Sequence, residues 1–164
     1  MADQPISFSG QGFSLQGDKG RFVLPPKFRK AVKELSFGDK VLCVDKHDRW
    51  NCLVGFGLSR KDAFEAQIAR EEELAAQRGE YFDRDTRLSQ LFGYSEVPFD
   101  DSGRFVLPRY LIDLVMIDDG MYFHGGGTFF TIWAPAELAK MEKGWDSAKA
   151  SCAAFQAAAR ERKP

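Results

Sequence analysis

Gly20-Arg21-Phe22-Val23-Leu24-Pro25 occurs twice in this chain, and the second copy is Gly103–Pro108. An identical pair of six residues has chance odds on the order of 10⁻³ in a chain of this length, so it indicates an internal duplication. The copies lie further apart than the period of about 20 to 50 residues that is typical of solenoid repeats. The sequence therefore predicts two related small units.

The composition is that of a compact globular chain. It has 164 residues, of which 44% are hydrophobic and 29% are charged, enough to bury a sizeable core. No run of about 18 apolar residues indicates a membrane span. Met1–Gln4 lacks the basic and apolar regions of a secretory signal, so we expect a cytoplasmic protein without a membrane partner.

The cysteines predict reduced thiols. Cys43, Cys52 and Cys152 form no C-x-x-C pair and leave one thiol over, which argues against a disulfide framework or a zinc site. If Val41–Asp45 and Trp50–Val54 form a hairpin, Cys43 lies opposite Cys52. We interpret that pair as cross-strand packing rather than as a redox switch.

A strand and a helix are predicted directly after the first hexapeptide. Phe22–Leu24 is a short apolar run, and Pro26 suits the first turn of a helix that extends to Leu35. Its apolar positions recur at spacings of three and four, which turns Phe28, Ala31, Val32 and Leu35 to the core and leaves Lys27, Arg29, Lys30 and Lys33 on or near the solvent side.

Two helices are predicted between the hexapeptides. Ser59 resembles the N-cap of a helix that extends to about Arg78, and Arg84–Phe92 is predicted to form a further helix. After the second hexapeptide the sequence repeats the plan of the first copy. The remaining predicted elements are a strand at Phe105–Leu107, a helix from Pro108 to about Ile117, strands at Met121–Phe123 and Phe129–Trp133, a helix at Pro135–Lys143 and an alanine-rich terminal helix from Asp146. We divide the chain into repeats at 7–80 and 81–145 and a C-terminal helix or tail at 146–164.

The sharpest motif places an arginine after a glycine. In Asp100-Asp101-Ser102-Gly103-Arg104 the glycine permits a tight turn, and Asp100 is predicted to hold Arg104 by a charge-assisted hydrogen bond. The first copy, Gly17–Arg21, has Gly17 at the aspartate position and Asp18 one residue late, although Gly20 is kept.

The pattern Asp-x-x-Gly-Arg followed by three apolar residues and Pro resembles the MraZ family of the AbrB-like superfamily, over about residues 7–143. The resemblance implies an α+β fold in which two tandem repeats form a double-split β-barrel, and assembly of protomers into a ring. It also implies sequence-specific DNA binding by a nucleoid-associated transcriptional regulator of the division and cell-wall gene cluster. The family's Asp/Arg signature maps fully only onto Asp100 and Arg104.

Positive charge is concentrated in the first copy, although the net charge of the chain is −1. Asp18–Lys33 carries six basic side chains and one acidic one, whereas the aligned Asp101–Met116 carries two of each. Phe28, Ala31 and Val32 align with Leu111, Leu114 and Val115, so the predicted core face is kept in both copies. We therefore expect the first copy to contact DNA and the second mainly to build structure.

The candidate DNA contacts follow from this difference. We expect Lys19 and Arg21 to read base edges, and Lys27, Arg29 and Lys30 to contact phosphates. Arg104 is a further candidate with a smaller expected loss on substitution. The alternative is that Lys27, Arg29 and Lys30 are only the solvent-facing side of an amphipathic helix. The chain would then be an AbrB-fold interaction protein or antitoxin-like scaffold.

No catalytic or metal site is predicted. Gly125–Gly127 reads as a hairpin turn rather than a phosphate loop, and Asp118-Asp119 as a loop before a strand. His47 and His124 sit at predicted turns without carboxylate or cysteine partners at metal-ligand spacing, so we expect surface or turn residues there rather than metal ligands. The expectation is therefore a protein that is not an enzyme, with no cofactor and no small-molecule substrate.

Overall fold

The structure is a computed structural model that describes residues 5–162. Met1–Gln4 and Lys163, which entered the predictions for the two ends of the chain, lie outside the described residues. The elements in chain order are β1 (Gln11–Leu15), a 3₁₀ turn η1 (Asp18–Gly20), β2 (Phe22–Val23), α1 (Pro26–Leu35), β3 (Val41–Lys46), β4 (Leu53–Phe56), a 3₁₀ segment η2 (Leu58–Ala63), α2 (Phe64–Gln77), α3 (Arg84–Phe92), β5 (Ser95–Pro98), β6 (Arg104–Phe105), α4 (Arg109–Leu114), β7 (Gly120–Gly125), β8 (Phe130–Trp133), α5 (Pro135–Leu138) and α6 (Asp146–Arg162).

The fold is α+β with antiparallel sheets, and the predicted α+β class is confirmed. One sheet has the strand order β1-β7-β8-β4-β3-β5, and β2 pairs with β6 in a separate two-stranded ribbon. Every pairing between neighbouring strands is antiparallel. The sheets surround a core rich in phenylalanine, in which Phe22, Phe105, Phe123 and Phe130 have 2% or less of their surface exposed.

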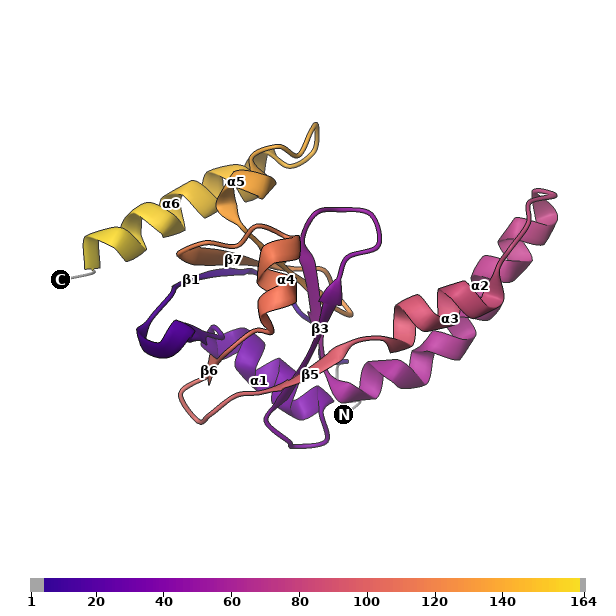
Figure 1. Ribbon diagram of the computed structural model, residues 1–164, viewed down its shortest axis with the longest axis horizontal. Helices are drawn as coiled ribbons and strands as arrows, with labels where there is room; N and C mark the ends of the chain where they lie inside the picture. Colours follow the sequence, from indigo (N-terminus) through magenta and orange to yellow (C-terminus); the bar gives the residue numbers. More distant parts are fainter. Residues whose placement is uncertain (1–4, 163–164) are drawn as a thin grey trace.

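The helices cover the outside of this core. Phe28 of α1 lies 5.0 Å from Phe130 and 6.1 Å from Phe123 between ring centroids, so α1 is anchored to β8 and β7. Figure 1 shows α6 lying along β1 and β7, while α2 and α3 form a paired arm that extends away from the sheets. Within residues 5–162 no helix has the length and apolar character needed to span a membrane.

Three helices agree closely with the sequence prediction. α1 and α3 have the predicted bounds, and α6 begins at Asp146 as expected. Proline at the start of α1 and the Asp83 side chain, which accepts the N–H of Thr86 at the start of α3, explain two of these beginnings. Pro26 is a signal that the sequence prediction uses, whereas the Asp83 cap is found only in the structure.

The prediction that Cys43 lies opposite Cys52 in a hairpin is wrong. Cys43 pairs with Phe56 across β3 and β4, and Cys52 lies in the loop that connects the two strands. His47 Nδ1 accepts the N–H groups of Arg49 and Trp50, both at 3.1 Å, and this turn lengthens the loop. Burial raises the pKa of the Cys43 thiol to about 12. The three thiols are buried and none is paired in a disulfide.

The helix predicted from Ser59 begins instead at Phe64. Leu58–Ala63 forms the 3₁₀ segment η2, and neither η2 nor α2 has a side-chain cap. The N–H of Leu58 donates to Ser36 Oγ at 3.0 Å, which ties this segment to the end of α1. This contact between distant parts of the chain prevails over the local capping pattern.

The helix after the second hexapeptide is shorter than predicted. α4 ends at Leu114 rather than near Ile117, because Met116 takes a φ of 60° and the N–H of Ile117 donates to the Ile112 carbonyl at 3.0 Å. Leu114 is 51% exposed, so its assignment to the core is wrong, and Ile112 is buried in its place. α5 likewise ends at Leu138 rather than at Lys143.

Candidate nucleic-acid interface

The two identical hexapeptides pair with each other. In the ribbon of β2 and β6, Phe22 faces Phe105 and Val23 faces Arg104. Both phenylalanines are buried, with ring centroids 6.4 Å apart. Because the ribbon is antiparallel and each arginine turn precedes its strand, the two turns lie at opposite ends of the ribbon.

The second turn is closed by a carboxylate, as predicted. Asp100 Oδ2 accepts from Arg104 Nε at 2.7 Å, and Oδ1 accepts the N–H groups of Arg104 at 2.9 Å and Ser102 at 3.0 Å. The bond from the Arg104 N–H is the main reason that the pKa of Asp100 lies below its usual value, and the Arg104 side chain adds to it. The charge of Arg104 is therefore compensated within the protein.

The first turn lacks that carboxylate. The backbone bond from Gly17 N–H to the Arg21 carbonyl is kept at 2.7 Å, but Arg21 Nε donates to the backbone carbonyl of Asp18 at 3.2 Å. Lys19 and Gly20 both take left-handed conformations, with φ of 60° and 70°. This conformation is unusual for a lysine and marks a turn of fixed shape. Arg21 makes no ion pair with any residue between 5 and 162.

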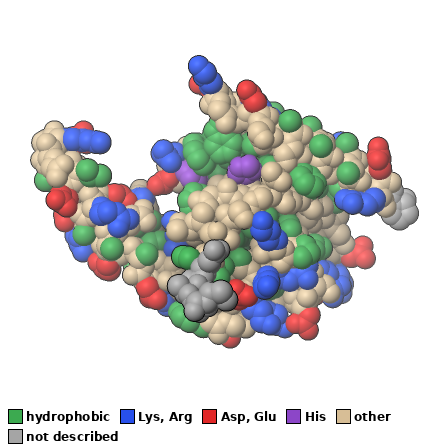
Figure 2. All heavy atoms as spheres, turned by 180° about the vertical axis from the view of Figure 1, so that it is seen from behind, with side chains coloured by type: hydrophobic (Ala, Val, Ile, Leu, Met, Phe, Trp, Pro, Cys, Tyr) green, Lys and Arg blue, Asp and Glu red, His purple; other side chains and the backbone are tan. Residues whose placement is uncertain are grey.

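Although Lys40 and, to a smaller extent, the charge of Lys33 lower the pKa of Asp101, the lysines of α1 also lack a close ion pair within residues 5–162. Their spacing of three residues places them along one side of the helix, and all three are exposed. None of them forms an ion pair within the described part of the chain. We call these lysines together with the cations of the first turn the α1 basic surface, which consists of Lys19, Arg21, Lys27, Lys30 and Lys33. Figure 2 shows Lys and Arg side chains gathered at the lower right, over the region in which Figure 1 places α1.

Arg29 differs from the other predicted phosphate contacts, because it is bonded inside the protein. Its Nη2 donates to the Leu24 carbonyl at 3.2 Å, and its Nη1 donates to the Asp101 carbonyl at 3.3 Å. A Cβ on Gly103 would lie 2.5 Å from Arg29 Nε, so the guanidinium packs directly on the second turn. Arg29 aligns with Ile112, which is buried. Arg29 thus joins α1 to the second turn.

Around the second turn the cations are paired with carboxylates. Arg109 Nε lies 3.0 Å from Asp113 Oδ1, and Lys40 Nζ lies 2.6 Å from Asp101 Oδ1, in addition to the pair of Arg104 with Asp100. Tyr110, which aligns with Lys27, places its hydroxyl 2.7 Å from Ser95 Oγ. The asymmetry seen in the sequence therefore extends to ion pairing. Among the described residues near the two hexapeptides, cations without an ion pair belong to the first copy, on its arginine turn and along α1, although α1 itself packs on the second turn through Arg29.

The glycine and aspartate segments predicted to form a turn and a loop lie in a turn and a loop. Gly125–Gly127 forms the turn of the hairpin of β7 and β8, as predicted, with Gly126 N–H donating to the Phe129 carbonyl at 2.8 Å. Asp118 and Asp119 lie in the loop before β7, also as predicted. Among residues 5–162, no group of three His, Cys, Asp or Glu side chains is arranged to hold a metal ion.

His47 lies in the loop between β3 and β4, at the predicted turn, but it is not on the surface. Its side chain is 6% exposed and stacks on Trp50 with ring centroids 4.4 Å apart. Burial lowers the pKa of His47, which favours the neutral ring that accepts hydrogen bonds through Nδ1. His124 is half-buried on β7, where its ring contacts the Tyr122 hydroxyl at 3.1 Å.

Lys33 is the one member of the α1 basic surface that was not among the candidate DNA contacts. It was expected only as a solvent-facing residue of the helix. The signal that identifies it is its spacing of three residues from Lys30, combined with the exposure of both side chains.

Comparison with curated proteins finds relatives along most of the chain, although no protein-family model matches it. The Transcriptional regulator MraZ of Oleidesulfovibrio alaskensis is 30% identical over 133 residues, which cover 81% of this chain and 84% of that protein. The protein of the same name from Parvibaculum lavamentivorans is 30% identical over 134 residues, covering 81% and 79%. That of Solidesulfovibrio magneticus is 29% identical over 126 residues, covering 77% and 78%.

Proposed function

Because the chain belongs to the MraZ family of transcriptional regulators, we propose that it regulates transcription by binding specific DNA through the α1 basic surface. The observation that carries this proposal is the uncompensated charge of five exposed or half-buried cations beside the first hexapeptide. Lysine and arginine that neutralise phosphates and release counterions supply most of the affinity of a protein for DNA. A protein with a small net negative charge can bind DNA when its free cations are gathered in this way.

The cations of this surface have different proposed roles. Arg21 and Lys19 lie on a turn of fixed shape, so they are the base-reading residues, since arginine fits the O6 and N7 acceptors of guanine. Lys27, Lys30 and Lys33 lie along a helix and contact phosphates, which sets the register of the protein on the duplex. Arg29 holds α1 against the second turn, and Arg104 contributes less because Asp100 already binds it.

We also propose that the fold is built from two repeats. Two tandem repeats, 7–80 and 81–145, form a double-split β-barrel, followed by a C-terminal helix or tail at 146–164, of which the structure describes α6 (Asp146–Arg162). Two observations support it. The hexapeptides pair with Phe22 opposite Phe105, which are equivalent residues. When β1 is exchanged with β5, β3 with β7 and β4 with β8, the strand order β1-β7-β8-β4-β3-β5 becomes its own reverse. An approximate two-fold axis between the copies requires this symmetry.

The proposed setting is the nucleoid in the cytoplasm, with the division and cell-wall gene cluster as the target. Protomers assemble into a ring that presents several α1 basic surfaces to repeated sites on one promoter. Linked sites of this kind raise the overall affinity well above that of a single protomer. Native mass spectrometry would test the assembly, and one closed oligomer of defined mass is the expected result.

No catalytic activity is proposed. The relatives are transcriptional regulators by name, and the described side chains of the α1 basic surface form no pair of nucleophile and base. The function therefore consists of binding, and its test is a binding measurement.

Salt dependence separates DNA binding from a scaffold role. Binding to duplex DNA from upstream of the gene itself should weaken with salt, with a log–log slope of about −2.7 for each protomer that places its three helix lysines on phosphates, and of several units for an assembly. A scrambled duplex of equal length is the control, and it should bind more weakly at every salt concentration. If the protein binds neither duplex at about 50 mM salt, the alternative of an interaction protein is favoured instead.

A further inference from the structure

A cavity of about 600 Å³ opens on the side of the molecule where the arm of α2 and α3 joins the sheet. Its wall combines the tip of the hairpin of β3 and β4, the segment η2 with the start of α2, part of α3, and Phe129 before β8. Its volume lies in the range of small-molecule sites, about 300 to 1,000 Å³. None of its lining residues belongs to the α1 basic surface.

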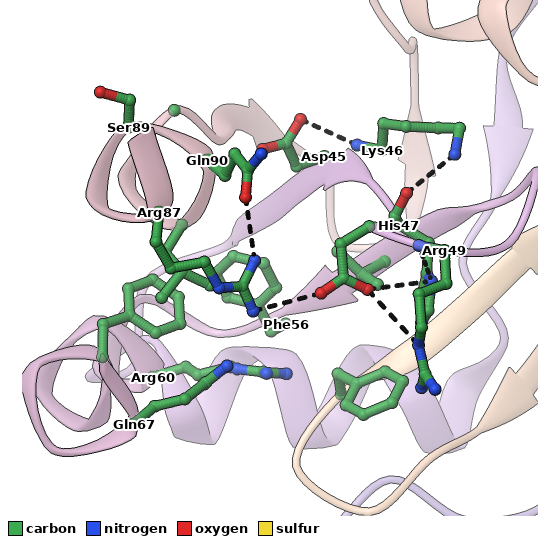
Figure 3. Close-up of a pocket in the computed structure, with 16 residues that line it drawn as sticks. Asp45, Lys46, His47, Arg49, Phe56, Arg60, Gln67, Arg87, Ser89 and Gln90 are labelled. Carbon is green, nitrogen blue, oxygen red and sulfur yellow. Dashed lines mark hydrogen bonds and ion pairs between the residues drawn. The ribbon is translucent and has the colours of Figure 1, made fainter. Parts of the chain in front are cut away.

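The floor of this cavity is aromatic and holds one arginine. The guanidinium carbon of Arg60 lies 5.3 Å from the ring centroid of Phe56, 5.8 Å from that of Phe64 and 5.1 Å from that of Phe129. Figure 3 shows the Arg60 side chain extending along the cavity, with Phe56 and Arg87 on the side above it. Cation–π contacts stabilise a guanidinium in such a place but leave its N–H groups without acceptors.

Arg60 has no anionic partner among residues 5–162. Its Nη1 atom is buried and makes no hydrogen bond. Burial lowers the pKa of Arg60, and the charge of Asp48 opposes this effect. A guanidinium remains protonated even so. A positive charge that is partly withdrawn from water and unpaired is unfavourable, so this position suits a group that brings a compensating anion.

The carboxylates of the neighbourhood are already used. Asp48 Oδ2 lies 3.1 Å from Arg87 Nη2, and Glu71 Oε1 lies 2.7 Å from Arg87 Nε. Asp45, which also lines the cavity, accepts the N–H of Lys46 through Oδ1 at 2.8 Å. The dashed contacts in Figure 3 join Arg87 to its partners, and none reaches Arg60. Arg87 is therefore fixed as part of the wall, whereas Arg60 is free to bind.

We propose that this cavity binds a small organic anion, a carboxylate carried on a flat apolar body. Arg60 accommodates the carboxylate in the two parallel hydrogen bonds that a guanidinium forms with it, and the rings of Phe56, Phe64 and Phe129 contact the apolar body. The ligand acts as an effector rather than a substrate, because no nucleophile is paired with a base in this cavity. The proposal does not depend on the assignment of the DNA-binding surface.

Binding of 2-naphthoate, measured by isothermal titration calorimetry, tests the site. The neutral amide 2-naphthamide is the matched probe, since it keeps the flat body and removes the charge. Saturable binding of one naphthoate per chain, at least tenfold tighter than naphthamide, is expected. Arg60→Met should weaken naphthoate at least tenfold and leave naphthamide within about threefold, because only the charge contact is lost.

Two further variants keep the test decisive. Arg70→Met removes an exposed arginine of α2 that does not line the cavity, and it should leave both probes unchanged. Arg60→Lys keeps the charge without the planar fork, so it should give an intermediate loss if Arg60→Met fails to fold. DNA binding without naphthoate should be the same for Arg60→Met and the wild type, which separates this proposal from the function above.

Two results would overturn the ligand site. One is naphthoate binding that does not saturate or that Arg60→Met leaves unchanged. The other is absence of naphthoate binding together with a changed native mass in Arg60→Met, which would mean that an acidic side chain of a second copy occupies the cavity.

Discussion

Arg21→Ala should weaken binding to the upstream DNA by more than tenfold at about 150 mM salt, whereas Arg104→Ala should weaken it by less than threefold. Each bidentate contact of arginine with a base contributes about 1–3 kcal/mol of discrimination. Arg21 is free to make one, since its Nε donates only to a backbone carbonyl, at 3.2 Å. Arg104 is held by Asp100 at 2.7 Å. Fluorescence anisotropy with labelled duplex measures both losses.

Arg21→Lys is the matched control for charge. It keeps the positive charge and removes the fork, so it should lose affinity for the specific duplex while keeping affinity for a scrambled one. Equal losses from Arg21→Ala and Arg104→Ala would show that the two turns contribute alike and would contradict the unequal roles proposed here.

Phe28→Ala should lower the free energy of unfolding by about 3–5 kcal/mol. Phe28 is 1% exposed and lies between Phe8, Phe123 and Phe130, with ring centroids 6.3, 6.1 and 5.0 Å away. Phe130 already packs against Phe8 and Phe123, with ring centroids 5.0 and 6.2 Å apart, so these rings can close only partly around the cavity left by the missing ring. Urea unfolding followed by circular dichroism measures the change.

Lys30→Ala on the opposite side of the same helix should change the unfolding free energy by less than about 0.5 kcal/mol, since it removes an exposed side chain. A loss below about 1 kcal/mol in Phe28→Ala would mean that α1 is not anchored through this ring. The fixed position of the α1 basic surface would then have no structural basis.

The sequence predicted those parts of the fold whose signals are local. The bounds of α1 follow from Pro26 and from apolar residues at spacings of three and four. β1 and β5 were missed, because Gln11–Leu15 and Ser95–Pro98 are short and become strands only through pairing with β7 and β3. Register in the hairpin of β3 and β4 was missed for a related reason, since it depends on how the buried His47 shapes the loop.

The candidate interface was predictable in its charge but not in its partners. The excess of cations near the first hexapeptide can be counted in the sequence. That Arg29 donates to the carbonyl of Asp101, and that Lys40 pairs with Asp101, depends on folding that joins residues far apart in the chain. The cavity around Arg60 has the same origin, because Phe129 reaches it from the other end of the sequence.

The most direct test of the central claim, that the α1 basic surface and not its second-half counterpart meets DNA, is the salt dependence of binding in Lys27→Ala/Lys30→Ala. Each phosphate contact contributes about 0.9 to the log–log slope, so the slope should become shallower by about 2 for each engaged protomer. Arg109→Ala, which removes a paired cation beside the second hexapeptide, should leave the slope unchanged. A slope unaffected by the double substitution, or changed equally by Arg109→Ala, would contradict the account.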